Sequence, residues 1–265
     1  MSVAERVSLR NLDDRLIGEG RYSVTVSELV AETAANPSAI RSGLARLVEK
    51  RRAFSSARGL FVFVPSEFRS WGVVPAEWFI DQMMQHLDRE YYVGLLSAAQ
   101  LQGAAHQRPQ VTQIVVDKPV ADRDLERVRL RFYASDAEFS KLPIQRRNTK
   151  TGTFAVSSPE LTVADLCGRP VLGGGLDNVA TIISELNEEQ NLTAEGFTNL
   201  AGLIAGHAVK RAGHLVESLT DLRLDDLAAE MHAGEPTMLD PHGDRRGPVD
   251  RRWNVRVNVK VEPEA

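Results

Sequence analysis

Residues 36–52 read NPSAIRSGLARLVEKRR, and this stretch decides the fold of the N-terminal part of the chain. Asn is a favoured helix N-cap, and Pro suits the first helical position because its missing N–H would have no partner there. We predict a helix that begins after Asn36 and ends near Arg51. At about 100° per residue its apolar side chains fall on one side, which should be buried. They are Ile40, Leu44, Leu47 and Val48.

The opposite side of this helix is polar and basic. It carries Ser38, Ser42, Ala45, Arg46 and Glu49, with Arg41 on its flank. Arginine can donate two hydrogen bonds to a guanine edge, and serine can reach phosphates or base edges. Residues 37–58 as a whole hold six basic side chains against one acidic one, a net charge of +5. This face is therefore a candidate DNA-binding surface.

The candidate DNA contacts fall into three groups. Those expected to contact bases or phosphates are Arg41 and Arg46, those expected to form hydrogen bonds are Ser38 and Ser42, and those expected to contact phosphate are Lys50, Arg52 and Arg58. Two other interpretations stay open. Basic residues near a helix C-terminus also stabilise its macrodipole, and Glu49 on this face would repel phosphate. A module of this kind can also dock another protein.

The elements around this helix are expected in the order of a winged helix-turn-helix. Gly18 and Gly20 stop a first helix, and Ser27 is the expected N-cap of a second one. The expected elements are a helix over 7–17, a strand over 22–26, a helix from 27 to about 34, the helix described above, and strands over 52–56 and 60–64 joined by a turn at 57–59.

A domain boundary is expected after this hairpin. The chain has 265 residues, enough for about two domains. Pro65 ends an apolar run, and Gly72 and Pro75 are further breakers. The sequence therefore predicts a winged helix-turn-helix domain over residues 1–65, a linker over about 66–74 and a second domain over 75–265.

The second domain is expected to be a mixed α+β fold. Helices are expected over 75–87, 91–101, 158–167, 179–186 and 197–219, and strands over 111–117, 128–133, 153–157 and 253–261. In the last strand the Val side should be buried and the intervening polar residues exposed. Loops are expected at 173–175 and 240–250.

Reactive residues in the second domain form no convincing catalytic pattern. Cys167 is expected to be a small buried hydrophobic residue, and His207 and His214 to be packing or surface residues. Gly173 and its two neighbours lack the Gly-Lys-Ser/Thr that a phosphate-binding loop needs. Asp117-Lys118 leaves a metal-dependent nuclease open as an alternative. No metal site or cofactor is expected.

The overall composition is that of an ordinary globular protein. Hydrophobic residues make up 43% and charged residues 26%, with a net charge of −4 that hides the basic segment. The single cysteine excludes internal disulfides. Because the start lacks an apolar signal core and no apolar run reaches about 20 residues, we expect a cytoplasmic protein without a membrane span.

Six segments resemble those of the AbiEi antitoxins, regulators of type IV toxin–antitoxin systems in abortive phage infection. In the N-terminal part they are YSVTVSEL at 22–29, AIRSGLARL at 39–47 and RGLFVFVP at 58–65. In the second part they are YYVGLLSAAQLQGAAHQ at 91–107, SSPELTVADL at 157–166 and LGGGLDNVA at 172–180.

This resemblance implies a transcriptional autorepressor whose first domain binds inverted repeats in its own promoter. It also implies that the second domain antagonises a nucleotidyltransferase-type toxin without forming a stable complex with it. The family supplies no catalytic residues, so no enzymatic activity is expected.

Overall fold

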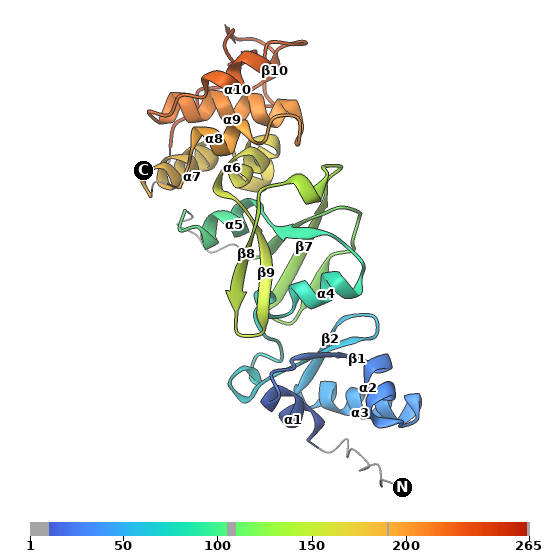
Figure 1. Ribbon diagram of the computed structural model, residues 1–265. Coiled ribbons are helices and arrows are strands. Elements are labelled where there is room, and N and C mark those ends of the chain that lie inside the picture. The colour runs from blue at the N-terminus through green and yellow to red at the C-terminus, as the bar shows by residue number, and fades with distance from the viewer. Residues whose placement is uncertain (1–10, 105–109, 190, 264–265) are drawn as a thin grey trace. The chain divides into compact units, whose positions relative to one another are not determined.

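The computed structural model describes residues 11–104, 110–189 and 191–263. The fold is a mixture of helices and several sheets, which confirms the predicted α+β class (Figure 1). Two compact units are present. One comprises Met1–Glu90, Val120–Arg131 and Arg146–Phe154, and the other comprises Tyr91–Pro119, Phe132–Gln145 and Ala155–Ala265.

The described residues 11–63 contain three helices and a three-stranded antiparallel sheet. The elements are α1 (Leu12–Gly18), β1 (Ser23–Thr25), α2 (Val26–Thr33), α3 (Pro37–Glu49), β2 (Ala53–Ala57) and β3 (Leu60–Phe63). The sheet order is β1-β3-β2. This is the order of elements that the sequence predicts, although the first helix begins later than expected and residues 7–10 lie outside the described part of the chain.

The N-cap predicted for α2 is wrong. The cap is Thr25 rather than Ser27, and the Thr25 hydroxyl accepts the Glu28 N–H at 3.1 Å. The Glu28 carboxylate in turn accepts the Thr25 N–H at 2.6 Å, which completes a capping box. Since this pair satisfies two N–H groups, it outcompetes a single serine cap, and Ser27 lies exposed in the first turn.

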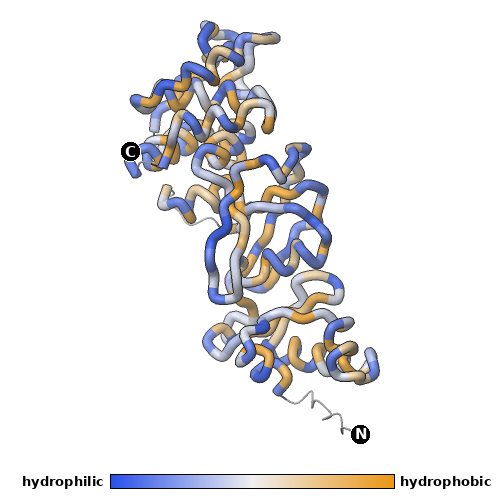
Figure 2. The backbone as a smooth tube through the Cα atoms, viewed as in Figure 1, coloured by the Kyte–Doolittle hydropathy of each residue, from blue (hydrophilic) through white to orange (hydrophobic). Residues whose placement is uncertain are grey.

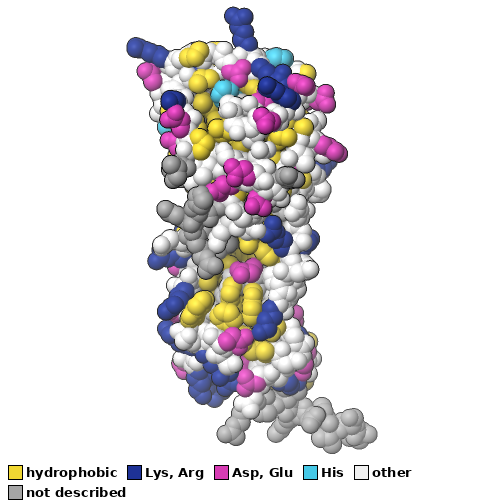
Figure 3. Space-filling model, turned by 90° about the vertical axis from the view of Figure 1, so that its left-hand side faces the viewer, with side chains coloured by type: hydrophobic (Ala, Val, Ile, Leu, Met, Phe, Trp, Pro, Cys, Tyr) yellow, Lys and Arg dark blue, Asp and Glu magenta, His cyan; other side chains and the backbone are white. Residues whose placement is uncertain are grey.

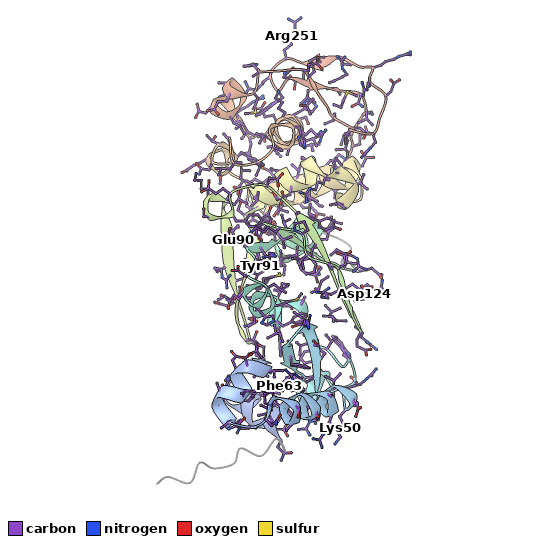
Figure 4. All side chains as sticks on the ribbon, turned by 90° about the vertical axis from the view of Figure 1, so that its right-hand side faces the viewer. Lys50, Phe63, Glu90, Tyr91, Asp124 and Arg251 are labelled. Carbon is purple, nitrogen blue, oxygen red and sulfur yellow. The ribbon has the colours of Figure 1, made fainter. Side chains whose placement is uncertain are left out.

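The core of this region lies between α3 and its neighbours. Ile40, Leu44 and Leu47 are buried as predicted, and they pack with residues of α1, β1, α2, β2 and β3. The prediction that Val48 is buried is wrong, because this residue is 38% exposed. At about 100° per residue it stands farthest from the centre of the apolar stripe. Figure 4 shows Phe63, the last residue of β3, inside this region. Figure 2 shows the hydropathy of the residues along this part of the backbone.

The rest of the chain contains a six-stranded sheet of order β6-β7-β5-β4-β9-β8. Its strands are β4 (Tyr91–Val93), β5 (Thr112–Val116), β6 (Arg123–Leu125), β7 (Val128–Ala134), β8 (Ile144–Thr149) and β9 (Gly152–Ser157). β4 pairs antiparallel with β5 and parallel with β9. The strands predicted over 111–117, 128–133 and 153–157 are thus confirmed, whereas β6 and β8 were not predicted.

Helices and a small sheet complete this part of the chain. The helices are α4 (Ile80–His86), α5 (Leu95–Leu101), α6 (Pro159–Gly168), α7 (Leu176–Glu188), α8 (Ala194–Thr198), α9 (Gly206–Leu219) and α10 (Asp225–Glu230). The small sheet has the order β10-β12-β11, formed by Thr237–Met238, Val255–Arg256 and Val249–Asp250. α6 packs against α5, α7 and α9 (Figure 1). Ser158 caps α6 through the Leu161 N–H, as predicted.

Several predicted elements in this region need correction. The helix over 91–101 is a strand followed by a helix, because the β-prone Tyr91–Val93 pairs with β5 and Gly94 separates the two. The helix over 197–219 is broken between α8 and α9, where Gly202 has a φ of 72°. The strand over 253–261 pairs only at Val255–Arg256, since both partner strands are two residues long. The helix over 75–87 begins as a 3₁₀ turn at Ala76–Trp78.

Glu217 on α9 anchors the segment that contains Trp253. Its carboxylate accepts hydrogen bonds from the Arg252 guanidinium at 2.7 and 2.8 Å, from the Leu224 N–H at 2.9 Å and from the Trp253 indole at 2.9 Å. Burial alone would raise the pKa of Glu217, but these hydrogen bonds outweigh it and lower the pKa to about 2. The Trp253 ring packs so closely on Gly213 that no Cβ fits there.

In the Glu217→Gln variant, the free energy of unfolding is expected to change less with pH in the acidic range. A carboxyl whose pKa is depressed by folding stabilises the protein above its unfolded value, near 4.5, and this stability is lost as the pH falls towards about 2. The variant should lose about 2 kcal/mol at pH 7 and show less change between pH 4.5 and 2.5. Urea unfolding at several pH values measures this. The exposed Glu188→Gln is the control, and an equal effect there would contradict the assignment.

Candidate nucleic-acid interface

The start of α3 is fixed by its cap. The Asn36 side chain accepts the Ser38 N–H at 2.8 Å, and Pro37 occupies the first helical position. This confirms the start predicted from Asn36-Pro37. The C-terminus lies at Glu49, two residues before the predicted end.

The turn that joins α2 to α3 is three residues long, Ala34–Asn36. Ala34 is the C-cap of α2, adopts a left-handed backbone with a φ of 51° and donates its N–H to the Val30 carbonyl at 2.9 Å. A residue that ends a helix with a left-handed backbone is usually glycine. Here an exposed alanine supplies it.

Ala34→Gly is expected to raise the free energy of unfolding by about 0.5–1 kcal/mol. Glycine removes the steric cost of a Cβ in the left-handed region, and the exposed methyl group contributes no packing. Chemical denaturation measures the change. Ala39→Gly, at an exposed α3 position with helical geometry, is the matched control and should destabilise. A loss of stability in Ala34→Gly would contradict the prediction.

The polar side of α3 is exposed as a continuous face. Ser38, Arg41, Ser42 and Arg46 all belong to it, together with Ala45 and Glu49. The Arg46 Nε donates to the Ser42 carbonyl at 3.2 Å, which aligns its guanidinium along the helix. The structure thus brings four of the seven predicted site residues onto one face.

Three of the predicted basic contacts have no side-chain partner among the described residues. Arg41, Lys50 and Arg58 are exposed, and none of their side chains forms a hydrogen bond or ion pair with the described residues. Figure 4 shows Lys50 at the C-terminal end of α3. Figure 3 shows Lys and Arg side chains gathered on the N-terminal part of one face. Such groups keep their full capacity to bind an external anion.

The β2–β3 hairpin presents Arg58 at its tip. Ala57 pairs with Leu60, so Arg58 and Gly59 form a two-residue loop in which Gly59 has a φ of 85°. A positive φ at this position is what glycine allows. The Arg58 carbonyl lies 3.0 Å from Nε2 of His86, which holds the tip against α4. No local pattern indicates this histidine contact, because His86 lies 28 positions from Arg58.

Arg52 is placed differently from the other six residues. Its guanidinium donates two hydrogen bonds to Asp13, from Nε to Oδ2 at 2.5 Å and from Nη2 to Oδ1 at 2.7 Å. Nη2 also donates to the Asp14 carboxylate at 2.8 Å. Asp13 is fully buried, and the Arg52 side chain is 22% exposed. Arg52 therefore neutralises an internal carboxylate that α1 carries, and the structure does not bring it onto the exposed α3 face.

The groups considered for catalysis are separate from this face. Burial raises the pKa of the Cys167 thiol to about 12, which makes it a poor nucleophile and confirms its reading as a buried apolar residue. His214 Nδ1 lies 2.7 Å from the Asp250 carboxylate. Within the described ranges, no three or more His, Cys, Asp or Glu side chains gather as metal ligands.

Comparisons with known proteins identify both a family and a fold. Residues 92–218 match the family model described as the AbiEi antitoxin C-terminal domain. The chain is similar in structure to the RV2827C protein from Mycobacterium tuberculosis, with a TM-score of 0.62 and 15% sequence identity over 93% of this chain and 89% of that one. That likeness concerns the fold. Curated protein sequences give no match. None of the described helices combines the length and apolar character that crossing a bilayer requires.

Proposed function

Since the chain belongs to the AbiEi antitoxin family through residues 92–218, we propose that it is the antitoxin of a type IV system and represses its own promoter. The family assignment implies a toxin as functional partner. On this proposal the partner is a nucleotidyltransferase-type toxin, antagonised without a stable complex, and both act in the cytoplasm in defence against phage. The chain itself performs no catalysis.

We assign promoter binding to residues 1–65 as a winged helix-turn-helix domain, followed by a linker over 66–74 and an antitoxin domain over 75–265. The observation that carries the assignment is the exposed face of α3, with its two arginines and two serines opposite a buried apolar side. The three-residue turn after α2 fits a helix-turn-helix. The antiparallel hairpin that ends at Arg58 fits a wing.

The contacts divide into reading and anchoring groups. In this proposal Arg41 and Arg46 approach base edges or phosphates from α3, and Ser38 and Ser42 add hydrogen bonds. Lys50 and Arg58 anchor the protein on phosphates to either side. Inverted repeats would be bound by two copies of the chain. Arg52 stabilises the fold of this domain through its ion pair with Asp13.

A gel-shift assay with the DNA upstream of the protein's own coding sequence tests the proposal. The full chain should retain this DNA at concentrations that leave a scrambled fragment free. Affinity should fall with salt, each neutralised phosphate adding about −0.9 to the slope of log K against log salt. Equal retention of both fragments would contradict specific recognition, and no retention even at low salt would favour a protein-docking role for the same domain.

A metal-dependent nuclease is the second candidate, because Asp117 directly follows β5. Its Oδ1 is buried and has no hydrogen-bond partner among the described residues. Incubation with plasmid DNA and Mg²⁺ or Mn²⁺ distinguishes the two functions. Cleavage that Asp117→Ala abolishes would establish the enzyme, and intact plasmid would support the repressor. A nucleotidyltransferase-like toxin gene beside this one would support the antitoxin role.

A further inference from the structure

A pocket of about 430 Å³ lies between the end of α6, the start of α9 and the loop after β10. It is lined on the polar side by Arg169, Arg211, His207 and His242, and on the apolar side by Pro170, Val171, Leu172 and Pro241. Gly168 completes the lining, and no carboxylate contributes to it. A lining that combines cationic groups with apolar ones is suited to an organic anion.

Arg211 is the buried cation of this pocket. The residue is 5% exposed, and its guanidinium donates to three backbone carbonyls, those of Met238 at 2.7 Å, Cys167 at 3.3 Å and Gly168 at 3.5 Å. Among the described residues it has no ion pair with a carboxylate, and Nη2 forms no hydrogen bond. Buried charges in proteins are normally paired. Burial lowers the pKa of Arg211, and the charge of the nearby Asp240 carboxylate, which forms no ion pair with it, offsets only part of this effect.

Arg169 adds a second positive charge at the same place, and His207 adds an imidazole beside it. Arg169 is half-buried at the end of α6 and donates one hydrogen bond, to the Ala134 carbonyl at 2.8 Å. Burial lowers the pKa of His207, and the nearby Arg211 and Arg169 lower it further. Both guanidinium groups therefore lie close enough to act on this histidine. The positive charge that both arginines place beside His207 favours the binding of an anion there.

The first turn of α9 strengthens this positive potential. α9 spans 14 residues, and its N-cap, Ala205, makes no side-chain cap hydrogen bond. His207 lies in this first turn, where N–H groups point out of the helix and favour anions. A neighbouring pocket of about 420 Å³ shares Gly168, Arg169 and His207, but it contains the carboxylates of Asp136 and Asp165. An anion is therefore favoured on the Arg211 side.

The apolar side of the pocket indicates what the anion is attached to. Val171 is 69% exposed, the highest value among the exposed large hydrophobic side chains of the described residues. It belongs to the 3₁₀ turn Pro170–Gly173 that directly follows Arg169. An apolar or planar group joined to the anion would cover this side chain.

We propose that this pocket binds a small organic phosphate. The phosphate is held by Arg169, Arg211 and the start of α9, and its apolar body lies against Val171. Two guanidinium groups and a helix N-terminus match a dianion with three oxygens better than a carboxylate with two. The site lies outside residues 1–65 and does not depend on promoter binding.

Calorimetric titration of the full chain with phenyl phosphate tests the proposal. One molecule should bind per chain, more tightly than inorganic phosphate, and benzyl alcohol should not bind. Arg169→Gln should weaken phenyl phosphate binding about tenfold, the effect of losing one charge-assisted hydrogen bond. His242→Ala, at an exposed position, is a second variant that should weaken binding without affecting folding.

Arg245→Ala is the matched control, because Arg245 lies on the same loop as His242 and does not line the pocket. Its affinity should remain that of the unsubstituted protein, and thermal unfolding should verify that each variant is folded. The proposal is overturned if phenyl phosphate does not bind at millimolar concentration, or if Arg245→Ala weakens binding as much as Arg169→Gln. Equal affinities for phenyl phosphate and inorganic phosphate would remove the role assigned to Val171.

Discussion

Arg52→Ala is expected to lower the free energy of unfolding by about 3 kcal/mol. The substitution leaves the fully buried carboxylate of Asp13 without its bidentate partner. Removing one member of a buried pair costs several kcal/mol because the remaining charge stays desolvated. Arg52 is itself 22% exposed, so water can approach the site and the expected loss lies at the lower end of that range.

Chemical denaturation of Arg52→Ala and Arg51→Ala side by side measures the effect. Arg51 is the adjacent residue, 54% exposed, and its ion pair with Glu126 is 3.4 Å long, so its loss should change stability by less than about 0.5 kcal/mol. Asp13→Asn with Arg52→Gln should recover part of the stability, because the paired charges are removed together. Equal losses in the two single variants would refute the role given to Arg52.

Arg41→Ala combined with Arg46→Ala is expected to reduce affinity for promoter DNA by about 100-fold. A single arginine that reads a guanine contributes roughly 1–3 kcal/mol of discrimination, so two such contacts multiply to this size. Arg46→Ala alone should relax the preference at one base pair. Arg58→Ala should instead weaken binding to all sequences alike and lower the salt slope by about 1.

The control for this double substitution removes the same charge elsewhere. Arg15 on α1 and Arg245 are exposed and belong to neither α3 nor the hairpin. Arg15→Ala with Arg245→Ala should change affinity less than threefold if the α3 face carries recognition. A similar loss in both double variants would mean that net charge alone drives the binding, and specific reading by α3 would be refuted.

The start and exposed face of α3 were predictable because their signals are local. Asn36 bonds a residue two positions away, and the 3.6-residue period places the polar face opposite Ile40 and Leu44. The role of Arg52 was not predictable. Its partner Asp13 is 39 positions away in the sequence, and nothing near Arg52 distinguishes a buried ion pair from a free basic residue.

Strands that depend on their neighbours were missed for a related reason. β8 contains the polar run Gln145–Asn148 and shows no alternating apolar pattern, yet it forms an edge of the six-stranded sheet beside β9. Its extended conformation comes from pairing with β9 rather than from its own residues. The pocket around Arg211 was equally hidden, because three segments separated along the chain form it.

The direct junction of β1 and α2 has a consequence for protein engineering. β1 ends at Thr25 and α2 begins at Val26, and the Thr25 capping box closes over this junction. No linker residue separates the strand from the helix, so an inserted tag or loop here would have to break either the pairing with β3 or the cap. The exposed residues Arg245 and Arg246 lie in the loop at 241–248, outside the N-terminal region, and neither side chain forms a hydrogen bond or ion pair with the described residues. Fluorescent labels and affinity tags placed there should leave the N-terminal region intact.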